Sequence, residues 1–315
     1  MSSDKRFAQR RGLVTAGLGA GLLAGTIQAS GAAAAGRERE AGRGPGPDGM
    51  YAVNVNGAMW AYKDKGKGPP ALFLHSFLLN SNLWTDQLNG LSDIRRCIAP
   101  DMRGWGRSEP VTDEYLDPLK YTDDVIEFLD KIGVDEPVDL VGMSVGGFIC
   151  ALLCERIPKR VASITLISAA LDWKRDLIYE RYQAEMARIA VVEGKDALFR
   201  RFDEYIDGVA PTLSNRARYK QMLLETRTEM IVKFLTIQGR TQPRPDLAAK
   251  IKVPVLLPIG SADVVITPER ADAMAKQFSN AEVARIEGAG RLLSLESPEE
   301  FNKALRTLWT GRAKR

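Results

Sequence analysis

The chain has 315 residues, 45% of them hydrophobic and 27% charged, which is typical of one large globular domain or two small ones. Three cysteines and a single histidine, His75, leave almost nothing with which to build a nitrogen or sulfur metal site, so zinc enzymes and zinc fingers are excluded. The net charge of +4 arises within residues 1–45, which hold seven Lys or Arg and three acids. The rest of the chain carries 37 basic and 37 acidic residues, and without a long-range positive field it is not expected to bind nucleic acid.

The N-terminal segment 1–35 has the pattern of a bacterial export signal. Basic residues, among them the pair Arg10-Arg11, precede an uncharged run rich in Gly, Ala and Leu, and alanines 32–34 offer a small-residue cleavage site. The pair resembles that of a twin-arginine signal. The alternative is an uncleaved membrane anchor, which the glycines of the run disfavour. We therefore expect an exported protein, periplasmic or extracellular, that is not attached to the membrane after cleavage.

After a predicted flexible leader over 36–49, short apolar runs alternate with helical patterns. Several runs are apolar throughout, as in buried strands of a mostly parallel sheet with right-handed crossovers. The predicted strands are 51–55, 59–62, 71–74, 97–99, 138–141, 161–167, 253–258 and 283–286. The predicted helices are 83–91, 121–132, 145–157, 268–278 and 298–310. Residues 50–170 and 243–315 are thus expected to form an α/β core with an eight-stranded sheet flanked by helices.

Residues 171–242 interrupt this alternation because they carry no strand signal. Aromatic residues recur at helical spacing, for example Phe199, Phe202 and Tyr205, and single residues of this kind are better explained by packing than by ligand contact. The segment is predicted to be a helical lid inserted between two core strands. A lid over a sheet implies a pocket beneath it.

The first candidate catalytic motif is Gly142-Met143-Ser144-Val145-Gly146, which follows a predicted apolar strand and leads directly into a predicted helix. This is the strand, turn and helix context of a nucleophile elbow. The turn is expected to hold Ser144 in a strained conformation that exposes its hydroxyl, while the glycines let strand and helix approach each other. Ser144 is therefore the candidate nucleophile, which argues against an aspartate-nucleophile dehalogenase. Backbone N–H groups at the start of the helix point at the reaction centre.

From about residue 51 to its C-terminus, the chain resembles the α/β-hydrolase family of serine esterases, lactonases and haloperoxidase-like proteins. His75-Ser76-Phe77 is similar to the loop that supplies half of the family's oxyanion hole, and segment 101–108, with Trp105, looks like the loop after the fourth strand. The resemblance implies that the N–H groups of Phe77 and Val145 are the oxyanion donors. His75, Ser76, Met143 and Trp105 would then lie in the loops around the pocket.

Two C-terminal segments complete the resemblance. Segment 258–263 presents Asp263 where the family has its catalytic acid, and segment 288–298 resembles the histidine loop but has Arg291 in the histidine position. An arginine stays protonated and has no acceptor, so Arg291 cannot take the serine proton. His75 usually has a structural part in the family, which disfavours it as a displaced base. We expect an ion pair between Asp263 and Arg291, the alternative being that Arg291 binds an anionic group of a ligand.

Three functions stay open. The resemblance favours a serine-hydrolase-type enzyme for a small ester, lactone or related carbonyl compound, with Ser144, Asp263 and Arg291 at its centre. The alternatives are a non-catalytic relative that binds a small ligand under the lid, and a lyase or isomerase that uses the same pocket. All three expect a small-molecule partner. No organic cofactor is expected, because the chain has no phosphate loop and no dinucleotide-binding glycine pattern. The oligomeric state has no signal in the sequence.

Overall fold

The computed structural model describes residues 45–46, 49–110, 117–172, 177–206, 213–237 and 242–311, all within one compact unit that begins at Arg39. The predicted export signal and most of the predicted leader lie outside the described residues. Among the helices that are described, none has the length and apolar character that crossing a membrane requires.

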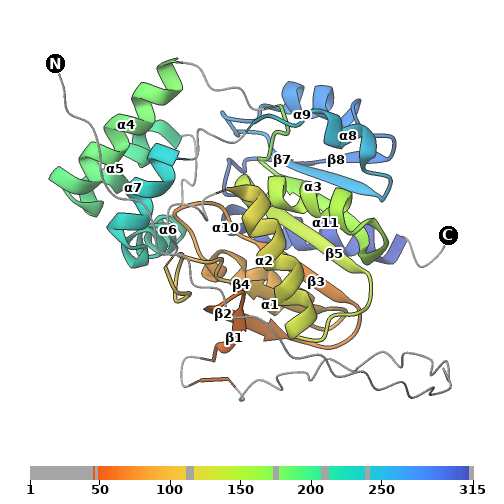
Figure 1. Ribbon diagram of the computed structural model, residues 1–315. Helices are drawn as coiled ribbons and strands as arrows, with labels where there is room; N and C mark the ends of the chain where they lie inside the picture. Colours follow the sequence, from red (N-terminus) through yellow and green to blue (C-terminus); the bar gives the residue numbers. More distant parts are fainter. Residues whose placement is uncertain are drawn as a thin grey trace, which may run out of the picture. The chain divides into compact units, whose positions relative to one another are not determined.

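An eight-stranded sheet forms the core, with strand order β1-β2-β4-β3-β5-β6-β7-β8 (Figure 1). Its strands are β1 Tyr51–Val55, β2 Ala58–Lys65, β3 Pro70–Leu74, β4 Arg96–Pro100, β5 Val138–Met143, β6 Val161–Ile167, β7 Val255–Gly260 and β8 Ala281–Ile286. β2 pairs in antiparallel fashion with β1 and β4, and all other pairs are parallel. The predicted eight-stranded, mostly parallel sheet is confirmed.

The strand ends differ from the prediction for local reasons. β2 runs on to Lys65 because its polar end still pairs with β4, which a reading based on apolar runs misses. β7 begins at Val255, since Pro254 lacks the N–H that a strand ladder needs. Asn56 and Gly57 join β1 to β2 with φ of 46° and 82°, the left-handed pair of a tight hairpin turn.

Helices cover both faces of the sheet. Those of the core are α1 Thr85–Leu91, α2 Pro118–Lys131, α3 Val145–Arg156, α8 Asp246–Lys250, α9 Pro268–Ala275, α10 Leu293–Glu296 and α11 Pro298–Gly311. α2 packs on α3, and α1 packs on α11; Figure 1 shows α2 and α3 in front of the sheet and α11 behind it. The loops that follow β3, β5, β6 and β7 leave the sheet at its carboxyl edge, where ligands of open α/β sheets bind.

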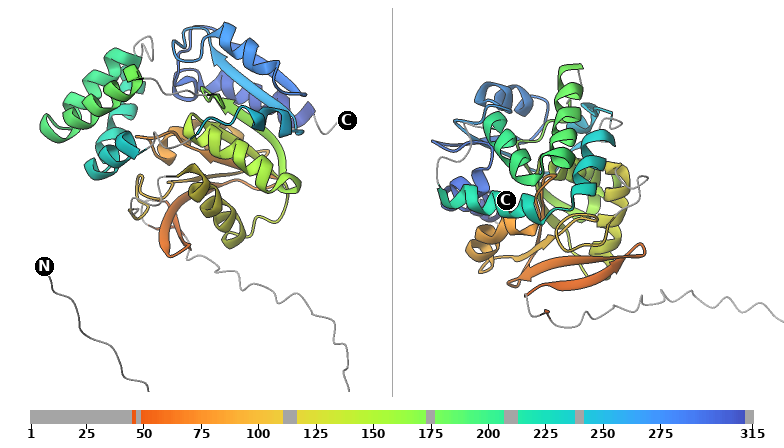
Figure 2. Two further views of the ribbon diagram at one scale, coloured as in Figure 1. Left: turned by 45° about the horizontal axis from the view of Figure 1, so that its top comes forward. Right: turned by 90° about the vertical axis from the view of Figure 1, so that its left-hand side faces the viewer.

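The described part of segment 171–242 contains four helices and no strand. They are α4 Leu177–Val192, α5 Lys195–Ile206, α6 Leu213–Glu225 and α7 Thr228–Ile237, which we call the helical insertion (green to cyan in Figure 2). Polar contacts tie α6 to the core: Arg218 pairs with Asp86 at 2.6 Å, and Asn80 Nδ2 donates to Glu225 at 2.8 Å. The insertion is therefore fixed to the loop after β3 and to α1.

Candidate active site

Ser144 occupies a strained turn between β5 and α3. Its φ of 52° and ψ of −116° lie where side chains other than glycine rarely occur. The turn is held on both sides, because the Ser144 N–H donates to Ile167 O at 2.9 Å and the Ser144 carbonyl accepts from Phe148 N at 3.0 Å. Strain maintained in this way holds the half-buried hydroxyl at the carboxyl edge of the sheet.

Two glycines make the turn possible. A Cβ on Gly142 would come within 2.5 Å of the Gly146 backbone, and a Cβ on Gly146 would come within 2.3 Å of Leu74 O and 2.7 Å of His75 O. The first turn of α3 thus lies directly against the end of β3. This close approach brings the loop at 75–77 beside Ser144.

The loop after β3 and the start of α3 contain the two expected oxyanion donors. Val145 is the first residue of α3, so its N–H has no intrahelical acceptor. Phe77 is half-buried, and its ring stacks on Phe234 of α7 with centroids 4.6 Å apart. Ser76 does not adopt a left-handed backbone, because the positive φ of this loop, 64°, falls on Leu78.

His75 is fully buried, and both of its ring nitrogens are used by the backbone. Nδ1 lies 2.7 Å from Ser76 O, and Nε2 accepts the N–H of Met102 at 2.9 Å. This pair of partners fixes the neutral tautomer that carries its proton on Nδ1. Burial lowers the pKa of His75 below its ordinary value of 6.5. His75 therefore joins two loops and is not a displaced general base.

Asp263 lies after β7 and is buried, with three donors on its carboxylate. Oδ1 accepts the N–H groups of Val265 at 2.8 Å and Ile266 at 3.0 Å, and Oδ2 accepts the hydroxyl of Ser168 at 2.7 Å. Ser168 follows β6 with a left-handed φ of 46°. The side chain that contacts this carboxylate is thus a serine.

Arg291 lies close to Ser144 without pairing with Asp263. Nη1 donates to Ser168 Oγ at 3.1 Å, and Nη2 donates to Ser144 Oγ at a long 3.4 Å. The expected ion pair between Asp263 and Arg291 is wrong, because the Ser168 hydroxyl lies between them: it donates to the carboxylate and accepts from the guanidinium. Among the described residues, no side chain accepts the proton of Ser144.

A glutamate that the sequence analysis did not single out fixes the Arg291 loop. The carboxylate of Glu296 accepts the N–H of Gly290 at 2.5 Å and the N–H of Leu292 at 2.9 Å, the residues on either side of Arg291. Neither Glu296 nor Ser168 belongs to a motif with a characteristic spacing. Their parts follow from contacts between loops that are far apart in sequence.

Met143 and Trp105, both expected around the pocket, are buried. Met143 ends β5 next to Ser144, and Trp105 packs edge-on against Phe234 with centroids 5.5 Å apart. Tyr219 of α6, in the helical insertion, is buried. Burial raises its pKa, and the positive charge of Arg291 opposes this shift.

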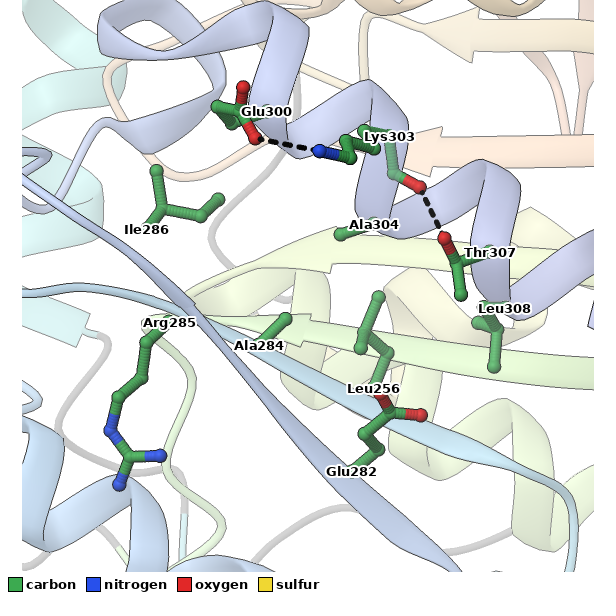
Figure 3. A pocket seen from close by; sticks show the side chains of 10 residues that line it. All are labelled: Leu256, Glu282, Ala284, Arg285, Ile286, Glu300, Lys303, Ala304, Thr307 and Leu308. Carbon is green, nitrogen blue, oxygen red and sulfur yellow. Dashed lines mark hydrogen bonds and ion pairs between the residues drawn. The ribbon is translucent and has the colours of Figure 1, made fainter.

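A surface pocket elsewhere on the core lies between β8 and α11 (Figure 3). Ala284 and Ile286 line it from the strand, and Lys303 and Thr307 line it from the helix. None of the predicted site residues lines this pocket. In the described part of the chain, no group of three or more His, Cys, Asp or Glu side chains is arranged to hold a metal ion.

One family model matches most of the chain. Residues 69–298 match the model of the alpha/beta hydrolase fold. The chain belongs to the α/β-hydrolase family. The loop after β3, Ser144 and Asp263 after β7 all lie within the matched residues.

Similar curated proteins include a chloroperoxidase and a lipase, and an esterase and a lactonase are among the solved structures that share the fold. The chain is 29% identical to non-heme chloroperoxidase CPO-A1 of Kitasatospora aureofaciens over 78% of its own length and 93% of that protein, and 25% identical to Lipase 1 of Psychrobacter immobilis over 78% and 79%. Among solved structures, a thermophilic esterase from Thermogutta terrifontis matches with a TM-score of 0.75 at 23% identity, covering 84% of this chain and 98% of that one. The enol-lactonase of Burkholderia xenovorans LB400 matches with a TM-score of 0.72 at 23% identity, covering 82% and 99%.

Proposed function

We propose that this protein binds a small carbonyl compound of the ester or lactone type at Ser144 and does not turn it over at the rate of a serine hydrolase. One observation carries the proposal: the group next to Ser144 Oγ, in the histidine position, is the guanidinium of Arg291. A guanidinium donates and does not accept, so the proton of Ser144 has nowhere to go during nucleophilic attack. His75 does not replace the missing base, because both of its ring nitrogens are engaged.

The rest of the site suits a bound carbonyl group. The Val145 N–H at the start of α3 and the Phe77 N–H in the neighbouring loop supply the oxyanion donors, and the helix dipole adds positive potential. A lipase among the similar curated proteins, and an esterase and a lactonase among the solved structures that share the fold, support an ester or lactone as the ligand class. The helical insertion, which contacts Phe77 through Phe234, serves as the lid.

A slow serine hydrolase is the second candidate, and the retained strain at Ser144 favours it. A positive guanidinium beside the hydroxyl stabilises an alkoxide, and sites without a complete triad retain roughly a thousandfold acceleration over water. The two candidate functions have the same ligand class and differ in the rate at which the ligand is hydrolysed.

Labelling with a fluorophosphonate separates them. We expect no adduct on Ser144 of the wild-type protein by mass spectrometry. We expect Arg291→His to label at least about a hundredfold faster, because a positioned general base contributes that much. Arg291→Gln, which removes the guanidinium without adding a base, is the matched control and stays unlabelled.

Rapid labelling and turnover of an activated ester by the wild-type protein would show that it is a working hydrolase and would overturn the proposal. Since the Ser168 hydroxyl occupies Oδ2 of Asp263, the double variant Arg291→His with Ser168→Gly frees the carboxylate for the new imidazole. Glycine also tolerates the left-handed φ at position 168. If only the double variant is labelled, both Ser168 and the missing base prevent the reaction of Ser144.

We also propose that the protein is exported to the periplasm or the medium. The support is the sequence of residues 1–35, with its Arg10-Arg11 pair ahead of an uncharged run.

A further inference from the structure

The guanidinium of Arg291 is a partly buried cation that pairs with no carboxylate in the described ranges of the chain. It makes two hydrogen bonds, both to neutral hydroxyls. Three of its five N–H donors therefore have no partner in this part of the chain. Other partly or fully buried arginines pair with carboxylates, as Arg95 does with Asp139, Arg103 with Asp124 and Arg218 with Asp86.

The nearby acid cannot neutralise this charge by direct contact. The Asp263 carboxylate is occupied by two backbone N–H groups and by the Ser168 hydroxyl. The first N–H groups of α3 add positive potential on the side of Ser144. A partly buried cation that is not paired with an anion costs free energy, which a bound anion would offset.

The position of Arg291 is fixed before any ligand arrives. Glu296 holds the N–H groups of Gly290 and Leu292, so the loop is clamped on both sides of the arginine. The Ser168 hydroxyl then fixes one edge of the guanidinium at 3.1 Å. A donor fork held in place in this way loses little entropy on binding, which raises affinity for a planar anion.

We infer that Arg291 is the anion-recognising residue of the site and that the ligand carries a carboxylate a few bonds away from its ester or lactone carbonyl. This inference rests on the proposed function, because the same ligand places its carbonyl near Ser144 and the donors of Phe77 and Val145. A carboxylate fits better than a phosphate, since one guanidinium supplies a bidentate fork but a single positive charge. Arg291 contacts Ser144 through Nη2, so the two ligand groups lie within one small molecule's reach.

Calorimetric titration of the full chain with a matched pair of esters tests the inference. The probes are the monomethyl ester of glutaric acid, which keeps one carboxylate, and the dimethyl ester, which has none. We expect the wild-type protein to bind the monoester at least about tenfold more tightly, the worth of hydrogen bonds to a charged group. Arg291→Met should remove this preference and Arg291→Lys should retain part of it, because lysine keeps the charge but not the fork.

Arg285→Met is the matched control, since Arg285 lies on β8 and pairs with Asp272 on the surface. It should keep the wild-type preference. Circular dichroism and melting temperatures establish that each variant is folded. If Arg291→Met does not fold, the salt dependence of the wild-type preference decides instead, because a charge-based preference falls as ionic strength rises.

Equal binding of the two esters, an unchanged preference in Arg291→Met or a salt-independent preference would overturn the inference. Absence of binding of both esters at millimolar concentrations would overturn the proposed function, and the inference with it. Tighter binding of inorganic phosphate than of the monoester would contradict the carboxylate assignment. Rapid hydrolysis of either ester by the wild-type protein would contradict the proposed function but not the inference. In that case the KM values of the two esters would measure the preference for the carboxylate.

Discussion

Among single residues, His75 is the one whose protonation affects folding most directly. The folded protein holds it neutral, with Nδ1 on Ser76 O and Nε2 on the Met102 N–H, and burial lowers its pKa. Protonation would turn Nε2 from an acceptor into a donor that faces another donor. The unfolded chain has no such restriction and titrates near 6.5.

We therefore expect the free energy of unfolding to fall as the pH falls below about 6.5, with a slope approaching 1.4 kcal/mol per pH unit from this group. The sign follows from proton uptake, because below this pH the unfolded chain binds a proton that the folded chain does not. The loss ends once the pH is below the lowered pKa of folded His75. Urea titrations between about pH 7 and pH 5 measure the slope, above the range in which ordinary carboxylates titrate.

His75→Gln is the control, since an amide offers one donor and one acceptor but no titration in this range. Its slope should be flatter by the contribution of the histidine. As His75 is the only histidine, its ring signals in an NMR pH titration are unambiguous. Ring shifts that titrate at 6.5 in the folded protein would contradict a buried neutral imidazole.

At the scale of elements, α7 and the loop after β3 are joined through aromatic rings. Phe234 stacks on Phe77 at 4.6 Å and meets Trp105 edge-on at 5.5 Å. Thr226, just before α7, donates its hydroxyl to Leu78 O at 3.4 Å. The helical insertion thus contacts the residue whose N–H we assign to the oxyanion hole, and we expect α7 to restrict the motion of that loop.

Phe234→Ala should loosen this loop. Deleting a buried phenylalanine ring costs about 3 kcal/mol of stability, and here the cavity opens directly against Phe77. We expect faster amide hydrogen exchange at residues 76–79, measured by mass spectrometry. Phe199→Ala is the matched control, because Phe199 packs on Tyr219 inside the insertion. It should lose comparable stability while exchange at 76–79 stays unchanged; the same acceleration in both variants would contradict a specific connection through Phe234.

The elements differ in how far the sequence could predict them. The sheet and the elbow follow from local patterns, since a buried strand reads as an apolar run and Gly142 and Gly146 flank Ser144 at fixed spacing. Ser168 gave no such signal, because its part arises only where the end of β6 meets Asp263 and Arg291, more than 90 residues away in sequence. The prediction of an ion pair between Asp263 and Arg291 was wrong for the same reason. Residue types and their order in the sequence place a carboxylate and a guanidinium in one site, but they do not reveal the Ser168 hydroxyl between them.

At the scale of the whole molecule, the excess positive charge and the candidate site lie in different parts of the sequence. Residues 1–45 carry the excess positive charge, and the rest of the chain, which holds the fold and the site, is balanced. A balanced body offers little long-range steering, so recognition of an anionic ligand depends on the local charge of Arg291. It also leaves the basic N-terminus free for a separate purpose, which we propose to be export.

Conservative changes in the Arg10-Arg11 pair test export. Arg10→Lys with Arg11→Lys keeps the charge but removes both guanidinium groups, so only specific recognition of arginine is lost. In a bacterial host with a twin-arginine pathway, we expect the wild-type protein in the periplasm, with an N-terminus close to alanines 32–34, and the double variant as an uncleaved cytoplasmic precursor. Arg6→Lys, outside the pair, is the control and should be exported normally. Export of the double variant at the wild-type level would exclude the twin-arginine route, and a wild-type protein that keeps residues 1–35 in the membrane fraction would establish an anchor instead.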